Sequence, residues 1–242
     1  MIMENCDNRK SICKKALLPS IAIVAGLALL GHFISEGLTS IANQEQYVTV
    51  KGLAERDVLA NKVVWPLPYK CVSNDMQTLY DNIEKNRDIV LSFLKEGGIT
   101  DDEIVISAPA VTDRLAQSYI PDNIKFRYQA EAVITVISPQ VEKVIELMGK
   151  QIELMKDGVI ISDEYSYQTQ FEYTALNDIK PAMVEEATRN ARAVAQKFAE
   201  DSDCKLGNIK QATQGQFSIT SDETTPQIKN IRVVTTVKYA LN

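Results

Sequence analysis

Hydrophobic residues recur at helical spacing in three parts of the chain. In each part, apolar side chains repeat every three or four residues and so share one face of a helix. The pattern predicts amphipathic helices at about 75–96, 139–156 and 179–201, the first of them ended by Gly97 and Gly98. The expected inward stripes are Met76, Leu79, Tyr80, Ile83, Val90 and Leu94; Val141, Val144, Ile145, Met148, Ile152 and Met155; and Met183, Val184, Ala187, Ala191, Val194, Ala195 and Phe198.

Between and around these helices, β-branched and aromatic residues predict extended strands. The expected strands lie at 47–52, 57–71, 126–137, 159–173 and 231–239. Strands that follow one another along the chain favour hairpin pairing, and the helices need a sheet to cover. The fold class expected from this pattern is α+β, with a mixed, largely antiparallel sheet and about three amphipathic helices packed on it.

A run without charged side chains lies near the N-terminus, at 16–35. Helical geometry makes this run about 30 Å long, which is the thickness of a bilayer core. Basic residues precede it, so the positive-inside rule keeps the N-terminus in the cytoplasm. We expect a cytoplasmic basic tail at 1–15, a transmembrane signal anchor at 16–35, a linker at 36–46 and an exported domain at 47–242.

This topology places the chain in the cytoplasmic (inner) membrane as a single-pass protein. The membrane is then its first partner, and the C-terminal domain stands in the periplasm or the extracellular space. The alternative is a signal peptide that is cleaved after the small residues Ser40, Ile41 and Ala42.

Composition removes several functional classes. The chain of 242 residues has a net charge of −6, whereas nucleic-acid binders usually carry a basic face. Its single histidine, His32, lies inside the apolar run, which excludes Ser-His, Cys-His and most zinc-hydrolase mechanisms in the exported part. Glycine motifs that cradle phosphates are missing as well. We therefore expect no catalytic residue, no cofactor, no metal site and no nucleic-acid partner.

Two cysteines, Cys71 and Cys204, follow the apolar run and would face an oxidising compartment. Their pairing does not follow from sequence. Two alternatives therefore stay open, a Cys71–Cys204 disulfide and two separate buried thiols.

Trp65, Pro66 and Pro68 mark a candidate contact surface. Alternate residues of a strand direct their N–H groups to the same side, so both prolines lack a donor on one edge. This predicts an edge strand or a bulged strand end. Beside Trp65, such an edge is suited to self-association into a homo-oligomer. The alternative is simple protection of an exposed edge.

Four aromatic residues form a second candidate surface. Tyr165, Tyr167, Phe171 and Tyr173 occupy odd positions of the expected strand 159–173 and so share one face. This face is a candidate site for an unidentified small molecule or peptide, with ordinary sheet packing as the alternative. Carboxylates occur in pairs along the chain, and an enzyme without histidine would need acids such as Asp163 or Glu185 buried together.

Several segments resemble the SIMPL-domain family. Residues 47–56 resemble its opening strand, 94–99 with Glu103 and Ile104 its helix end and following strand, and 231–237 its last strand. The strongest match lies at Pro181, Ala182, Met183, Ala187, Asn190, Ala191, Arg192, Ala195, Lys197, Phe198, Ala199, Leu206 and Gly207. The resemblance covers about 47–241 and carries no agreed catalytic residues. It implies an exported envelope protein; some relatives form ring-like oligomers and some are linked to stress tolerance.

Together these observations predict a membrane-anchored, exported protein with a non-catalytic structural or interaction role in the bacterial cell envelope. We expect it to self-associate and, from the resemblance, to be linked to envelope stress tolerance. Two alternatives are a periplasmic module that binds a ligand or peptide, and an enzyme that works without histidine.

Overall fold

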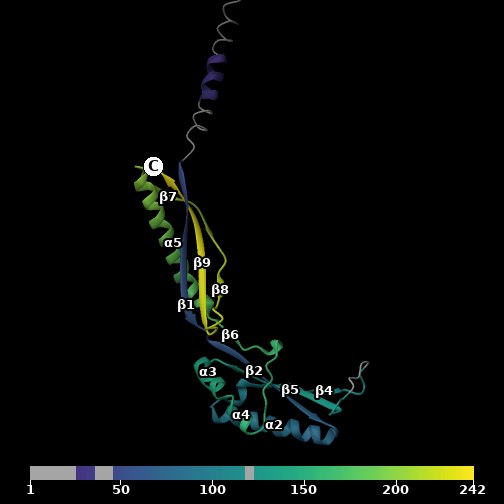
Figure 1. Ribbon diagram of the computed structural model, residues 1–242. Coiled ribbons are helices and arrows are strands. Elements are labelled where there is room, and N and C mark those ends of the chain that lie inside the picture. The colour runs from purple at the N-terminus through teal and green to yellow at the C-terminus, as the bar shows by residue number, and fades with distance from the viewer. Residues whose placement is uncertain (1–25, 36–45, 118–122) are drawn as a thin grey trace, which may run out of the picture. The chain divides into compact units, whose positions relative to one another are not determined.

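The computed structural model describes residues 26–35, 46–117 and 123–242 (Figure 1). Its strands are β1 (Tyr47–Leu59), β2 (Lys62–Ser73), β3 (Ile104–Ile106), β4 (Ala110–Asp113), β5 (Tyr128–Ser138), β6 (Gln170–Glu172), β7 (Leu206–Gln214), β8 (Ser218–Thr220) and β9 (Ile228–Leu241). Its helices are α2 (Met76–Glu96), α3 (Val141–Lys150), α4 (Glu153–Lys156) and α5 (Leu176–Asp201), with short 3-10 turns η1 (Asp101–Glu103) and η2 (Tyr165–Tyr167). The α+β class expected from the sequence is confirmed.

Two sheets are present where the sequence predicts one. The five-stranded sheet has the order β3–β5–β2–β6, with β4 also paired to β5, and is antiparallel throughout. The four-stranded sheet has the order β1–β9–β7, with β8 paired to β9. The expected strand 57–71 is therefore wrong, because it spans the end of β1 and the start of β2, which belong to different sheets.

The change of sheet occurs at Ala60 and Asn61, where the backbone finds other partners. The N–H of Ala60 donates to the carbonyl of Gln227 at 2.8 Å, and that of Asn61 to the carbonyl of Glu172 at 3.0 Å. The side-chain oxygen of Asn61 accepts from the N–H of Thr174 at 2.8 Å. These long-range bonds satisfy the buried polar groups that a break in a strand would otherwise leave unpaired.

By packing, the chain forms two compact units. One comprises the described residues up to Thr49 together with 195–211 and 238–242, and the other comprises 50–194 and 212–237. In the first unit, Lys205 and Asn242 exchange two backbone hydrogen bonds of 2.8 and 2.9 Å, and the N–H of Leu241 donates to Gln46. The ammonium of Lys238 lies 3.4 Å from the ring centre of Tyr47, a cation–π contact.

Helix α2 is confirmed at both ends. The carboxylate of Asp75 accepts from the N–H of Thr78 at 2.8 Å, which caps the first turn. After the helix, Gly98 takes a φ of +79°, a left-handed conformation that favours glycine. Leu79, Ile83, Val90 and Leu94 are buried as expected. Met76 and Tyr80 are 49% and 57% exposed, so their place in the predicted stripe is wrong.

The second expected helix is interrupted. Helix α3 ends at Lys150, just after Gly149, a poor helix former, and α4 begins at Glu153. The interruption changes the helical phase, so Leu154 is buried instead of the predicted Ile152 and Met155, which are 67% and 60% exposed.

Helix α5 starts at Leu176, so Pro181 lies inside the helix rather than in its first turn. Its buried stripe is the four-residue series Ala187, Ala191, Ala195 and Ala199 together with Met183, whereas the predicted members Val194 and Phe198 are exposed. A Cβ on Gly52 of β1 would lie 1.8 Å from the carbonyl oxygen of Ala187. The small residues therefore allow the backbones of α5 and β1 to meet.

The expected anchor lies only in part within the described residues. Residues 26–35 are helical with every residue exposed, whereas 1–25 and 36–45, which hold the basic tail, the first half of the anchor and the cleavage alternative, lie outside. Among the helices that the structure describes, none is both long and apolar enough to cross a membrane.

Candidate functional site

The two faces of the five-stranded sheet have different surroundings. Side chains at odd positions of β2, such as Val63, Trp65 and Leu67, belong to the core that also contains the buried residues of α2, α3 and α4. Their neighbours at even positions, with their partners in β5 and β3, point to the other side. We call this other side the outer face; it comprises Lys62, Val64, Pro66, Pro68, Lys70, Val72, Val105, Gln129, Glu131, Val133, Thr135 and Ile137.

The outer face has an apolar centre and charged ends. Pro66 pairs in register with Thr135, and Val64 with Ile137. Val105 and Ile137 are 47% and 38% exposed. At one end, the ammonium of Lys62 lies 2.9 Å from the carboxylate of Glu172. At the other end, Lys70 pairs with Glu164 and lies 3.8 Å from Glu131. An apolar centre within a polar rim is the usual composition of a protein contact surface.

The predicted edge strand holds only in part, because β2 lies between β5 and β6 in the sheet. Strand β6 pairs with Lys62–Val64, and beyond that point the second edge of β2 carries an isolated bridge between Tyr69 and Ile161. Ser162 lies at this second edge, where its N–H donates a hydrogen bond of 2.7 Å to the carbonyl of Pro68. Because the nitrogen and carbonyl of one strand residue point the same way, the missing donors of Pro66 and Pro68 also face it.

Trp65 does not belong to this surface. Its side chain is only 2% exposed and packs in the core under the helices. The prediction that Trp65 makes the oligomer contact is therefore wrong, since alternation in a strand sends it to the face opposite Pro66.

The four candidate aromatic residues do not share a strand, and the strand predicted at 159–173 is wrong. Tyr165 is 90% exposed in η2, Phe171 packs against the core of the five-stranded sheet, and Tyr173 packs against a second cluster around Met183. A hydrogen bond with Glu131 raises the pKa of Tyr167, which places its hydroxyl at the charged end of the outer face. The structure thus places Tyr167 beside Glu131 at the end of the outer face, and separates the other aromatics.

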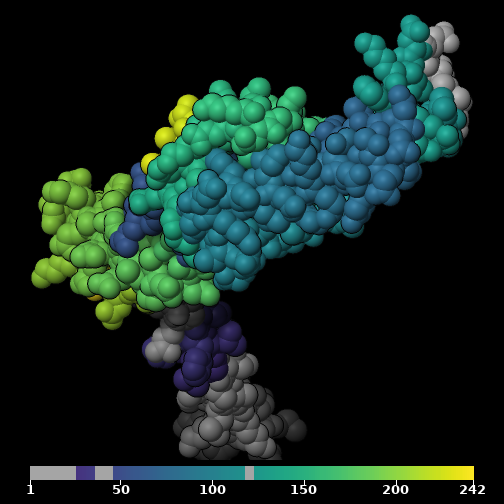
Figure 2. Space-filling view, turned by 90° about the horizontal axis from the view of Figure 1, so that it is seen from below, coloured from purple at the N-terminus to yellow at the C-terminus, as the bar shows by residue number. Residues whose placement is uncertain are grey.

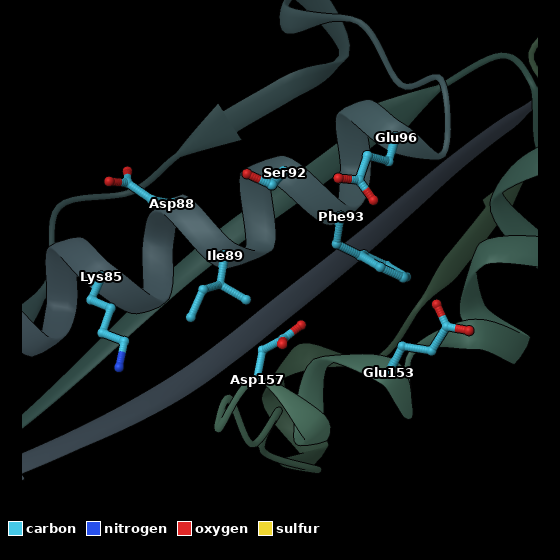
Figure 3. Close-up of a pocket in the computed structure, with 8 residues that line it drawn as sticks. All are labelled: Lys85, Asp88, Ile89, Ser92, Phe93, Glu96, Glu153 and Asp157. Carbon is cyan, nitrogen blue, oxygen red and sulfur yellow. The ribbon is translucent and has the colours of Figure 1, made fainter.

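A groove of about 550 Å³ lies between α2 and α4 (Figure 3). It is lined by Lys85, Asp88, Ile89, Ser92, Phe93, Glu96, Glu153 and Asp157. The groove does not follow from the sequence pattern, because the break between α3 and α4 places Glu153 and Asp157 beside α2 only in the folded chain. A signal was present in α2, where polar residues at 85, 88, 92 and 96 follow helical spacing beside the apolar Ile89 and Phe93.

A buried carboxylate, Glu103, joins three segments of the chain. It is 6% exposed and accepts hydrogen bonds from the Ser138 hydroxyl at 2.6 Å, the Thr100 N–H at 2.9 Å and the Gln140 amide at 3.2 Å. Burial by itself raises the pKa of Glu103, but these hydrogen bonds outweigh it and lower the pKa from 4.5 to about 2. Glu103 therefore holds the start of α3 against η1 as an ionised acceptor.

Replacing Glu103 with glutamine is expected to make the free energy of unfolding fall less steeply as the pH is lowered below 4.5. The folded pKa lies below the unfolded value of 4.5, so the carboxylate stabilises the fold above pH 4.5 and loses this effect as pH falls toward about 2. After allowance for solvent screening, the loss amounts to about 1–3 kcal/mol. Urea unfolding of the wild type and Glu103→Gln at several pH values measures it. If the free energy of unfolding falls equally steeply with decreasing pH in both proteins, this role for Glu103 is contradicted.

Cys71 and Cys204 are both free thiols in the structure. Cys71 is buried and accepts a hydrogen bond from the Asn86 amide at 3.3 Å, and Cys204 is partly exposed. Burial raises the pKa of the Cys71 thiol, which disfavours the reactive thiolate. The arrangement corresponds to the alternative of separate thiols, although Cys204 is less buried than that alternative expected.

The acids named for catalysis are not buried together. Asp163 and Glu185 are both exposed, and Glu164 and Glu186 next to them pair with Lys70 and Arg56. Within residues 26–35, 46–117 and 123–242, no group of three or more His, Cys, Asp or Glu side chains is arranged to hold a metal ion.

A family model described as SIMPL, a protein of unknown function (DUF541), matches residues 48–239. No curated protein matches the chain.

Proposed function

Because this chain belongs to the SIMPL family of proteins of unknown function, we propose a role that its own surfaces support: a membrane-anchored, exported protein that associates with further copies of itself. Its role in the bacterial cell envelope is non-catalytic and structural. The resemblance extends the proposal to envelope stress tolerance.

The outer face of the five-stranded sheet carries this proposal. Its apolar centre, with Val105 and Ile137 more than one-third exposed, is costly to leave in water. Cations and anions are paired at both ends, through Lys62 with Glu172 and Lys70 with Glu164. With Glu131 included, the face carries two ammonium groups and three carboxylates, so a second copy turned by a two-fold axis meets charges of both signs.

The anchor is supported by the sequence of 16–35 and by residues 26–35. The latter form a helix whose large apolar side chains, Leu27, Leu29, Leu30, Phe33 and Ile34, are all more than half exposed. A continuous apolar helix surface of this kind is stable when lipid covers it.

The full chain tests both parts of the proposal. After expression in a bacterium, it is expected to stay in the membrane fraction through a carbonate wash and to begin near Met1 by mass spectrometry. Light scattering after size exclusion in a non-ionic detergent is expected to give a protein mass of at least twice 27.0 kDa. A soluble chain that begins at Asn43 would remove the anchor, and a monomer would remove the self-association.

A pair of lysine substitutions locates the contact. Val105→Lys with Ile137→Lys adds two charges to the apolar centre of the outer face and is expected to reduce the oligomer to a monomer. The matched control is Tyr80→Lys with Ile160→Lys, which changes two apolar side chains that are 57% and 68% exposed elsewhere. We expect the control to keep the wild-type mass. Equal masses for all three proteins would exclude the outer face as the contact.

A further inference from the structure

The groove between α2 and α4 lies on the helix side of the five-stranded sheet and has no part in the proposed self-association. Figure 3 shows Ile89 and Phe93 of α2 directed toward Asp157 and Glu153. In the space-filling view of Figure 2, α2 (blue) lies uncovered at the front, so a partner can reach it. The groove is therefore an accessible surface.

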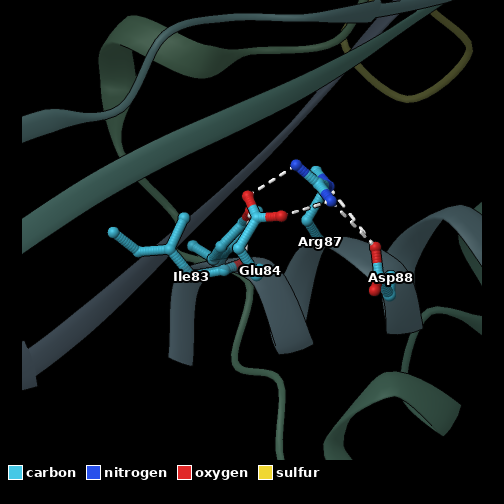
Figure 4. Close-up of polar contacts among 5 residues, drawn as sticks. Ile83, Glu84, Arg87 and Asp88 are labelled. Carbon is cyan, nitrogen blue, oxygen red and sulfur yellow. Dashed lines mark hydrogen bonds and ion pairs between the residues drawn. The ribbon is translucent and has the colours of Figure 1, made fainter. Parts of the chain in front are cut away.

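The charge of the groove is strongly unbalanced. Four carboxylates and one ammonium line it. Asp88 is partly neutralised, because the guanidinium of Arg87 lies 3.2 Å from it and 2.5 Å from Glu84 (Figure 4). Glu96, Glu153 and Asp157 form no salt bridge with any residue of the described chain. Glu153 interacts electrostatically with the nearby ammonium of Lys150, which pairs with Glu146. Glu96, Asp157 and, in part, Glu153 thus face water or a cationic partner.

The floor of the groove is apolar. Ile89 and Phe93 are half-buried, with one side against the core and the other toward the groove. Such a floor strengthens ion pairs formed above it, because it excludes water and lowers the local dielectric. Anionic ligands are excluded by the same carboxylates.

We propose that this groove binds a cationic amphipathic segment of a partner protein. Its Lys or Arg side chains pair with Glu96, Glu153 and Asp157, while its apolar side chains cover Ile89 and Phe93. A helix with basic and apolar residues at three- and four-residue spacing presents both sets from one side. Complementary charge above an apolar floor favours such a partner.

Binding of defined peptides to the full chain tests the inference. The probe is a fluorescein-labelled peptide of about 14 residues, or four helical turns, that repeats Lys-Leu-Leu-Lys. Its fluorescence anisotropy is expected to rise with added protein and to fall again with added salt. Peptides with Glu in place of Lys, or with Ser in place of Leu, are expected to bind at least about ten-fold more weakly.

Two pairs of substitutions show whether the groove is the site. Glu153→Gln with Asp157→Asn is expected to raise the Kd of the Lys-Leu peptide at least about five-fold. The matched control, Asp163→Asn with Glu185→Gln, removes the same charge from exposed, unpaired acids elsewhere and is expected to change it by less than about two-fold. Equal losses in both variants, an unchanged Kd in the first, or no binding by the wild type would each overturn the inference. None of these results depends on the oligomeric state.

Discussion

The substitution Gly52→Ala is expected to lower the free energy of unfolding by about 3 kcal/mol or more. The added Cβ would lie 1.8 Å from the carbonyl oxygen of Ala187 and 2.5 Å from the nitrogen of Ala191. Both are backbone atoms of α5, so neither moves away by a simple side-chain rotation. The helix must separate from β1, and the hydrogen bond from the Asn190 amide to the Leu53 carbonyl, 2.8 Å long, is strained with it.

Urea unfolding of the full chain, followed by circular dichroism, measures this effect. Gly149→Ala in α3 is the matched control, because its Cβ meets no atom within 4 Å. There alanine is the better helix former, and a gain of up to about 1 kcal/mol is expected. If Gly52→Ala and Gly149→Ala unfold at the same urea concentration, α5 does not pack on β1 as described.

Truncation of Trp65 to alanine is expected to cost about 3–5 kcal/mol of stability. The indole is 2% exposed and belongs to the core that contains the buried residues of α2 and α3. Its removal leaves a large cavity that other members of this core, such as Leu79 and Val90, do not fill without moving. The loss therefore appears in folding rather than in assembly.

The measurement is the urea midpoint of Trp65→Ala, followed by circular dichroism because the chain has no other tryptophan. Tyr165→Ala is the control: its side chain is 90% exposed, and a change within about 0.5 kcal/mol is expected. Should Trp65→Ala keep the wild-type midpoint but lose its oligomer, the indole would be a contact residue after all.

Much of the local structure follows from the sequence. The spacing of Leu79, Ile83, Val90 and Leu94 predicts α2, and the alternation in 231–239 predicts most of β9. Gly52 and the alanines of α5 are among the residues that resemble the SIMPL family. Their small size has a structural reason, since it allows helix α5 and strand β1 to meet. These features depend on neighbours close in sequence or on a repeated small residue, and so a single sequence reveals them.

The candidate surfaces were predicted only in part. Pro66 and Pro68 were located correctly because missing N–H donors act on the strand itself. The other outer-face residues Val105 and Ile137 were not identified, because β2 pairs with residues of β5 about seventy positions away, and β5 pairs in turn with β3. The groove was missed for a related reason: the break after Gly149 brings Asp157 beside α2.

By itself, the sequence determined the α+β class, the family, the long apolar run at 16–35 and the centre of each long helix. All of these rest on local periodicity, backbone chemistry or composition. Only the tertiary structure decided that Trp65 is in the core, that β1 and β2 belong to different sheets and that Tyr165, Phe171 and Tyr173 have separate surroundings. These outcomes depend on which distant segments bury one another, and that choice lowers the free energy of the whole chain rather than of any one segment.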